Sequence, residues 1–166
     1  MMADNKKVTS HWCISFSGHF TSGDDLNLVL AKVNHLEILS VTPEGLRPIK
    51  QFTINGQVQV MKFFRPKGAD KDRLFVVTAR HLAMILETSG DGPTLEVVTK
   101  AYGNVGDRIG KRSETGTLAI IDPDSKVIAL RIYDALLKVS SVDTLTSGSF
   151  LDKKLKLKPR KPDIFV

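Results

Sequence analysis

A set of short apolar runs recurs three times along this chain, and this repetition constrains the fold more than any other feature. The central run of each set is almost continuously apolar, and these central runs occupy residues 26–31, 74–79 and 127–132. A run rich in β-formers precedes each of them, at 12–20, 57–64 and 117–121, and another follows, at 35–41, 81–87 and 135–141. The runs that follow begin 46 and then 54 residues apart, which is the scale of a repeated structural unit.

A fourth and more polar run completes the first two sets, at 46–54 and 94–102. Four short strands in a unit of about 40–50 residues are typical of a β-propeller blade. The polarity of the runs fits that geometry, because inner strands covered on both faces are apolar throughout, whereas Pro48 and Lys50 suit an outer edge. Turn-forming pairs such as Asn55-Gly56 separate successive runs, as hairpins require.

The first set, taken alone, is also compatible with a helix. Ser22 and Asp24 precede it as candidate caps, and the residues at near-helical spacing are Leu26, Val29, Leu30, Val33 and Leu36. We favour strands, because helices in this chain would have to be bounded by many hairpin turns. We therefore predict an all-β protein in which residues 1–142 form a partial β-propeller of about two and three-quarter four-stranded antiparallel blades. Propellers close with about 4–8 blades, so we expect an incomplete ring.

Residues 143–166 differ in composition from the repeat. They carry half of the formal net charge of +6, because three aspartates oppose six cations: Lys153, Lys154, Lys156, Lys158, Arg160 and Lys161. We interpret this segment as a flexible, exposed basic tail that makes at most weak, salt-sensitive contact with nucleic acid. The other 142 residues carry only +3, which is ordinary for a protein domain and does not indicate a nucleic-acid surface.

The cysteine content and the lengths of the apolar runs indicate the compartment. Cys13 is the single cysteine, so the chain has no internal disulfide framework. No apolar run approaches the 18–20 residues that a membrane-spanning helix needs, and the first residues lack a secretory signal. We expect a protein of a reducing compartment that is not associated with membranes.

Histidines and the cysteine are the first candidates for catalysis or metal binding. The histidines are His11, His19, His35 and His81. Only His11 lies near Cys13, and one such pair is too little for a zinc site. We interpret Cys13 as a small buried residue of the first strand, because a nucleophile would need a base that the sequence does not indicate. We predict no catalytic, cofactor-binding or metal-binding residues, hence a protein that is not an enzyme and needs no cofactor.

Three further segments resemble binding motifs but fail the tests for them. The glycine-rich stretch 101–117 lacks the spacing of a phosphate-binding loop, and we interpret it as a long loop between blades that offers a recognition surface. Asp122 and Asp124 do not continue into a calcium loop, so they predict a hairpin turn. The cations interleaved with aromatic residues at 62–67 fit the solvated end of a strand better than a nucleic-acid surface.

Four stretches closely resemble the family of the large subunit of the UV-damaged-DNA-binding protein, in its amino-terminal region. They are GHFTSGDDLNLVLAK (18–32), LEILSVTPEGLRPIK (36–50), FRPKGADKDRLFVVTA (64–79) and SETGTLAIIDPDSKVIALRIYDALLKV (113–139). The resemblance covers most of residues 14–139. The chain resembles the large subunits of the polyadenylation specificity factor and of a splicing factor less closely, because those subunits differ from it at TPEGLRP and FRPKG.

This resemblance implies a multi-propeller adaptor of cullin four–RING ubiquitin ligases that acts in DNA repair, in the nucleus and the cytoplasm. Its partners would be substrate receptors, held between the first and third propellers, while the second propeller holds the cullin. Family members are several times longer, so the resemblance implies a truncated interaction scaffold. A nucleic-acid-binding subunit of the RNA-cleavage, polyadenylation or splicing type is the alternative.

The chain departs from the family in three places. The family has Asp-Gly at a hairpin tip that is Asp134-Ala135 here, and alanine would cost about 1 kcal/mol if that tip needs a positive φ. The leading segment is shorter than in the family, and from about residue 140 the basic segment replaces the family's continuing strands.

No receptor-contact motif of the family falls on these positions, so we carry over no receptor-binding residues. We expect an unclosed propeller with exposed strand edges to be poorly soluble.

Overall fold

The three-dimensional structure is a computed structural model, and it describes residues 13–106, 110–134, 136–142 and 154–156. Almost every described element is a β-strand, in agreement with the predicted all-β fold. The described elements are β1 (Cys13–Gly18), β2 (Asn27–Lys32), β3 (His35–Thr42), β4 (Gly45–Thr53), β5 (Val58–Phe64), β6 (Arg73–Thr78), β7 (Leu82–Ser89), the short 3-10 helix η1 (Gly92–Thr94), β8 (Glu96–Asn104), β9 (Leu118–Ile121), β10 (Val127–Tyr133), β11 (Leu136–Ser141) and β12 (Lys154–Lys156).

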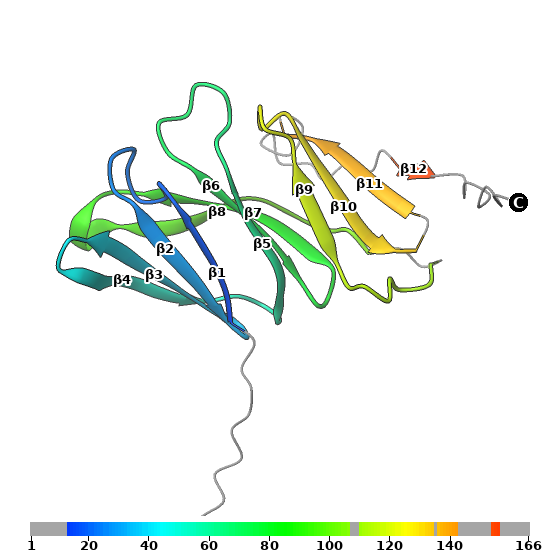
Figure 1. The fold of residues 1–166 in the computed structure, drawn as a ribbon, viewed down its shortest axis with the longest axis horizontal. Coiled ribbons are helices and arrows are strands. Elements are labelled where there is room, and N and C mark those ends of the chain that lie inside the picture. The colour runs from blue at the N-terminus through cyan, green and yellow to red at the C-terminus, as the bar shows by residue number, and fades with distance from the viewer. Residues whose placement is uncertain (1–12, 107–109, 135, 143–153, 157–166) are drawn as a thin grey trace, which may run out of the picture.

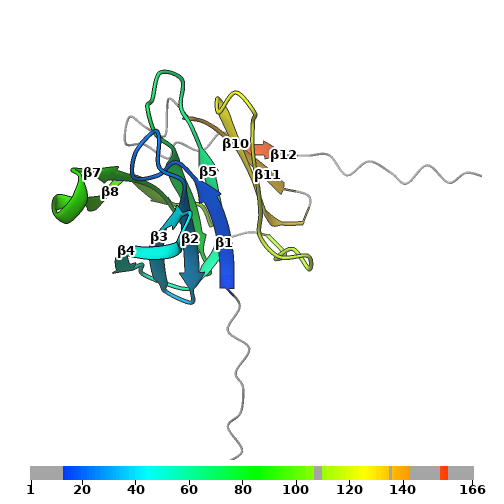
Figure 2. The same ribbon diagram turned by 60° about the vertical axis from the view of Figure 1, so that its left-hand side comes forward.

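The strands form three antiparallel sheets that follow one another along the chain like blades (Figure 1). Their strand orders are β1-β2-β3-β4, β5-β6-β7-β8 and β9-β10-β11-β12, so each sheet is a simple meander of hairpins. The first strands lie next to each other, because β1 contacts β5 and β5 contacts β9. Figure 2 shows the sheets extending outward in different directions from these first strands. The predicted partial β-propeller is confirmed.

The middle sheet is buried on both faces, and its central strand β6 shows why the apolar runs are continuous. Phe75 and Val77 point into a core shared with the third sheet, where Ile128 and Ile132 pack. Leu74 and Val76 point the opposite way, into a core shared with the first sheet. Successive side chains of a strand face opposite sides, so a strand between two sheets needs apolar residues at every position.

The fourth strands of the first two sheets are the exposed ones, as their polar composition predicted. Most side chains of β4 and β8 face solvent. Pro48 lies in β4, opposite Leu39, next to an irregularity in the register between Ile38 and Leu39. A proline is tolerated there because an outer strand has no further ladder partner for the missing N–H.

The helical alternative for residues 26–36 is excluded by the structure. Residues Asn27–Lys32 and His35–Thr42 pair as β2 and β3 around a turn in which Val33 adopts a φ of 59°. Ser22 caps a turn and not a helix, since its hydroxyl accepts a hydrogen bond from the Asp25 N–H at 2.9 Å.

The loop between β1 and β2 is fixed by the buried side chain of Asn27. The Asn27 Oδ1 atom accepts hydrogen bonds from the Phe20 N–H (2.9 Å), the Thr21 N–H (2.7 Å) and the Thr21 hydroxyl (3.0 Å). The loop is also tied to the second sheet, where the Thr88 hydroxyl donates to the Phe20 carbonyl at 2.6 Å. These contacts hold the ring of Phe20 in the core between the first two sheets, 5.6 Å from the ring of Phe63.

The third sheet has one strand more than we predicted. Residues Lys154–Lys156 form β12 and pair with β11, with Lys154 opposite Lys138 and Lys156 opposite Leu136. The interpretation of the whole segment 143–166 as a tail is therefore wrong at these three residues, because strand pairing uses backbone groups and tolerates lysines at alternate positions. The remainder of that segment lies outside the described residues, as does Ala135 of the Asp134-Ala135 tip.

Candidate interaction surfaces

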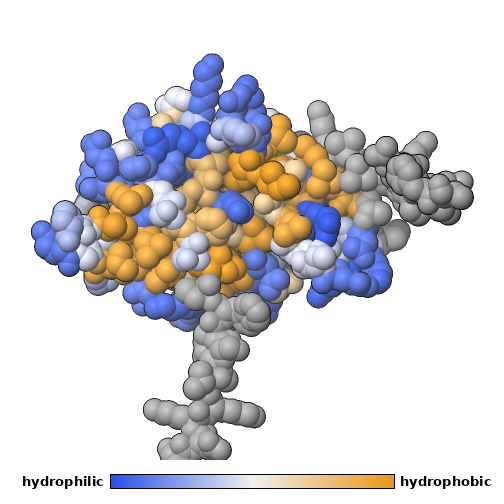
Figure 3. All heavy atoms as spheres, viewed as in Figure 1, coloured by the Kyte–Doolittle hydropathy of each residue, from blue (hydrophilic) through white to orange (hydrophobic). Residues whose placement is uncertain are grey.

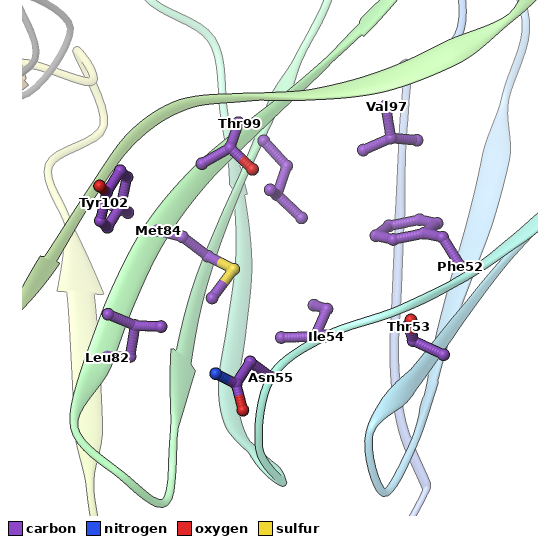
Figure 4. Close-up of a pocket in the computed structure, with 10 residues that line it drawn as sticks. Phe52, Thr53, Ile54, Asn55, Leu82, Met84, Val97, Thr99 and Tyr102 are labelled. Atoms are coloured by element: carbon purple, nitrogen blue, oxygen red, sulfur yellow. The ribbon is translucent and has the colours of Figure 1, made fainter.

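An apolar cleft of about 460 Å³ opens between the first and second sheets. Figure 4 shows side chains from the end of β4, from the residues after it and from β7 and β8 converging on this space. They include Phe52, Ile54, Leu82, Met84, Val97 and Tyr102. The described residues that line the cleft include no charged side chain, so the cleft suits apolar groups better than ions.

The two outer sheets each leave one apolar face without a neighbouring sheet. On the third sheet, Leu118 and Ile120 alternate with the buried Ala119, and Ile120 is 70% exposed. On the first sheet, Val41 and Leu46 lie opposite each other, and both are exposed. Figure 3 shows apolar side chains in a broad band across the face that Figure 1 presents. Faces of this kind usually contact another molecule or cause aggregation.

We expect charge on the open face of the third sheet to reduce aggregation of the isolated chain. The double substitution Leu118→Lys and Ile120→Lys should lower light scattering several-fold at equal protein concentration, because two lysines replace exposed apolar side chains. The pair Gln57→Lys and Ser89→Lys, at exposed positions outside that face, adds the same two positive charges and serves as the control. Equal effects of both changes would show that net charge, and not the apolar face, governs solubility.

A second, smaller pocket of about 150 Å³ lies where the second and third sheets meet. His81, in the turn between β6 and β7, lines it together with Arg112 and Ser113 of the segment before β9. The Arg112 backbone forms a β-bridge with Tyr133, and the Ser113 N–H donates to the Ile132 carbonyl at 3.0 Å, so this segment is held against β10.

His81 titrates in an environment that disfavours its charged form. Burial lowers the pKa of His81 below its usual 6.5, and the positive charges of Arg112 and Lys138 lower this pKa further. The ring also lies edge-on to Tyr133, whose hydroxyl oxygen is 3.5 Å from the His81 Nδ1 atom. The residue adopts a φ of 58°, a left-handed conformation that histidine and asparagine tolerate better than most residues.

Because of this lowered pKa, we expect acid to destabilise the fold through His81. Below pH of about 6.5 the unfolded chain binds a proton that the folded chain resists, so stability is fully present above that pH and is lost as the pH falls toward the folded pKa. Urea unfolding from about pH 7.5 down to 5 should show a smaller loss in His81→Asn than in the unchanged protein. His35→Gln, in β3, is the control, and an unchanged slope in His81→Asn would contradict the assignment to His81.

The family model described as RSE1/DDB1/CPSF1 first beta-propeller matches residues 13–162. The chain belongs to this family. The matched range extends past residue 142, where we predicted the propeller to end, and it includes β12. The family resemblance inferred from the sequence is thereby confirmed.

Several curated members of this family are DNA damage-binding proteins. The chain is 48% identical to DNA damage-binding protein 1 of Drosophila melanogaster over 127 residues, which cover 76% of this chain and 11% of that protein. It is 40% identical over 134 residues to DNA damage-binding protein 1 of Solanum lycopersicum and to DNA damage-binding protein 1a of Arabidopsis thaliana, covering 81% of this chain and 12% of each. The chain thus spans about an eighth or less of the length of these relatives.

The described histidines, His19, His35 and His81, lie in different parts of the fold. Within the described part of the chain, no three side chains among His, Cys, Asp and Glu lie close enough to hold a metal ion. The backbone N–H of His19 donates to the Asp72 carboxylate, His35 begins β3, and His81 lines the smaller pocket. Cys13 begins β1, as predicted, while His11 lies outside the described residues.

The basic segment 62–67 is engaged by the protein itself. The Lys62 ammonium lies 4.7 Å from the centre of the Phe16 ring, and Arg65 pairs with Asp72 at 2.7 Å. Phe64 is buried at the end of β5. The interpretation of this segment as a strand end is confirmed.

The other two segments also fit their structural interpretations. Asp122 and Asp124 lie in the hairpin turn between β9 and β10, closed by a hydrogen bond from the Ser125 N–H to the Asp122 carbonyl at 2.7 Å. The glycine-rich stretch begins inside β8, and its described part, 105–106 and 110–117, connects the second sheet to the third. Part of that connection lines the pocket at His81, which local sequence motifs did not indicate.

In the described ranges, no helix is both long and apolar enough to span a bilayer.

Proposed function

We propose that this chain acts as a non-enzymatic scaffold for protein–protein interaction, built like the beginning of the first propeller of DNA damage-binding protein 1. The observation that carries the proposal is 48% identity to that protein over 127 residues, in a chain whose described strands form three blade-like sheets. The apolar cleft and the two open sheet faces support it, because protein partners bury surfaces of this kind.

We also propose the cellular setting that the family resemblance implies. The chain would take part in DNA repair and protein ubiquitination through the contacts of the first propeller of an adaptor for cullin four–RING ligases, in the nucleus and the cytoplasm. Its partners would be substrate receptors. The matched region covers only 11–12% of the relatives, so the proposal for these 166 residues is limited to contacts that the first propeller makes.

Co-purification with the cullin tests this proposal directly. Immobilised full-length DNA damage-binding protein 1 serves as the positive reference, and the chain of 166 residues is compared at equal loading. We expect the full-length protein to retain the cullin and the shorter chain to retain none above the bead background. Retention at an affinity near that of the full-length protein would overturn the proposal that these residues make only the contacts of the first propeller.

Nucleic-acid binding is the second candidate function, and two observations favour considering it. The family description groups this propeller with those of RSE1 and CPSF1, and the segment 143–166 carries an excess of positive charge. DNA and RNA binding should be measured across a salt series, with the tail lysines at 153, 158 and 161 replaced by glutamine. Weak binding that disappears in this variant supports the scaffold, whereas sequence-selective binding that persists would favour the nucleic-acid function.

A further inference from the structure

The pocket between the second and third sheets is polar and carries an excess of positive charge. Gln59 from β5, His81 from the β6–β7 turn, and Arg112, Ser113 and Thr117 from the segment before β9 all line it. Among the described residues, no carboxylate lines it. Arg112 is exposed, and among the described residues it has no ion-pair partner. The acidic residue beside Ser113 in the sequence, Glu114, pairs with Lys111 at 2.7 Å and does not neutralise Arg112.

Two further cations lie around this pocket. The Arg131 guanidinium donates a hydrogen bond to the Ser113 hydroxyl at 2.9 Å and another to Thr115, so it holds Ser113 in place from the third sheet. Because Ser113 accepts from Arg131, its own proton is available to Thr115, 3.1 Å away, or to a ligand. Lys138 of β11 is only 6% exposed and lies close enough to His81 to lower the pKa of that residue.

The size of the pocket limits its ligand to one small group. At about 150 Å³ it is smaller than the 300–1,000 Å³ typical of sites for drug-sized molecules. A tetrahedral oxyanion matches its chemistry, since guanidinium, hydroxyl and amide groups all donate hydrogen bonds to such an anion. A nucleic-acid strand requires a row of phosphate contacts and stacking surfaces, but the described residues that line this pocket include no Phe, Tyr or Trp side chain.

We propose that this pocket is an oxyanion site that accepts a phosphoryl group carried on a side chain of a protein partner. Arg112 supplies the principal charge, Ser113 and Thr117 supply hydroxyl donors, and His81 lies beside the bound group. The choice of a protein as the source of that group rests on the proposed scaffold function, whereas the binding of a phosphoryl group rests on the pocket alone.

Proton NMR of His81 in the full chain provides the test, with inorganic phosphate and N-acetyl-phosphoserine amide as separate probes at matched ionic strength. A dianion beside the imidazole stabilises its protonated form, so both probes should raise the pKa of His81. Arg112→Gln should weaken the affinity for each probe about tenfold or more, because it removes the charged donor. Arg112→Lys should recover part of the binding. Arg47→Gln, on β4 and paired with Glu44, is the control and should change nothing.

Four results would overturn parts of this assignment. An unchanged His81 pKa with both probes, or an equal shift in Arg112→Gln with the fold intact by circular dichroism, would exclude an oxyanion site at this pocket. Binding of inorganic phosphate without N-acetyl-phosphoserine amide would exclude a side-chain phosphoryl group. Displacement of bound phosphate by single-stranded oligothymidine at lower concentrations than by the phosphoserine probe would assign the site to nucleic acid. None of these readouts involves the cullin, so they fail or succeed independently of the co-purification test.

Discussion

Replacing Asn27 with alanine should lower the free energy of unfolding by about 3 kcal/mol. Asn27 is fully buried, and its carbonyl oxygen is the acceptor for two backbone N–H groups and one hydroxyl of the β1–β2 loop. Alanine would leave these donors without a partner in a region closed to water, which costs about 1–3 kcal/mol for each group that finds no new acceptor. Typical domains have only about 5–15 kcal/mol of stability, so the loss would be a large part of the total.

Urea unfolding of three variants tests this role of Asn27. Asn27→Asp retains an oxygen that can accept the same hydrogen bonds, so we expect it to lose less stability than Asn27→Ala at neutral pH. Asn55→Ala removes the same amide from an exposed turn, where the Asn55 Oδ1 atom accepts only a 3.3 Å bond from Arg80, and should cost less than about 0.5 kcal/mol. A loss of under about 1 kcal/mol in Asn27→Ala would mean that the loop has other acceptors.

Phe75→Ala should destabilise the protein by about 4 kcal/mol, mainly by loosening the third sheet. The Phe75 side chain is 0% exposed in the centre of β6 and belongs to the core shared with Ile128 and Ile132 of β10. Its removal leaves a cavity that rigid neighbouring sheets fill poorly, which adds to the lost burial of the ring. The substitution should weaken the packing of the second sheet on the third and leave its packing on the first sheet intact, since the opposite face of β6 packs on the first sheet through other residues.

Hydrogen exchange combined with urea unfolding distinguishes this local effect from a general one. In Phe75→Ala we expect amides of β10 to lose more protection than amides of β3, because only β10 packs on the altered face. Phe52→Ala removes the same ring from the half-buried rim of the apolar cleft and should cost much less. Equal loss of protection in both strands would indicate that the three sheets unfold as one unit.

The strands were predictable because their pattern repeats along the chain and because a strand buried on both faces has a continuous run of apolar residues. The continuous apolar run at 74–79 coincides almost fully with β6, Arg73–Thr78, since its residues 74–77 pack alternately into the two cores. Proline and lysine in the fourth run marked β4 as an outer strand for an equally local reason. The helical alternative at 26–36 could be set aside only by considering all turns together.

The features that sequence reasoning missed are those that depend on distant partners. Lys154–Lys156 alternate lysine and leucine, but their charge suggested a tail, and only the free edge of β11 explains why they pair. The pocket at His81 also draws Gln59 and Arg112 from separate parts of the chain, so no local spacing could indicate it. Asn27 was equally inconspicuous, because its three donors belong to residues six and seven positions earlier.

The double burial of the middle sheet has a consequence for how members of this family diverge. A substitution in β6 must suit two packing interfaces at once, since Phe75 and Val76 face different neighbouring sheets. Substitutions in β4 and β8 meet mostly solvent and are constrained by little more than hairpin pairing. Evolutionary change should therefore accumulate along the outer strands and be slowest in β6, so that new partner specificities arise at the rim while the arrangement of the sheets persists.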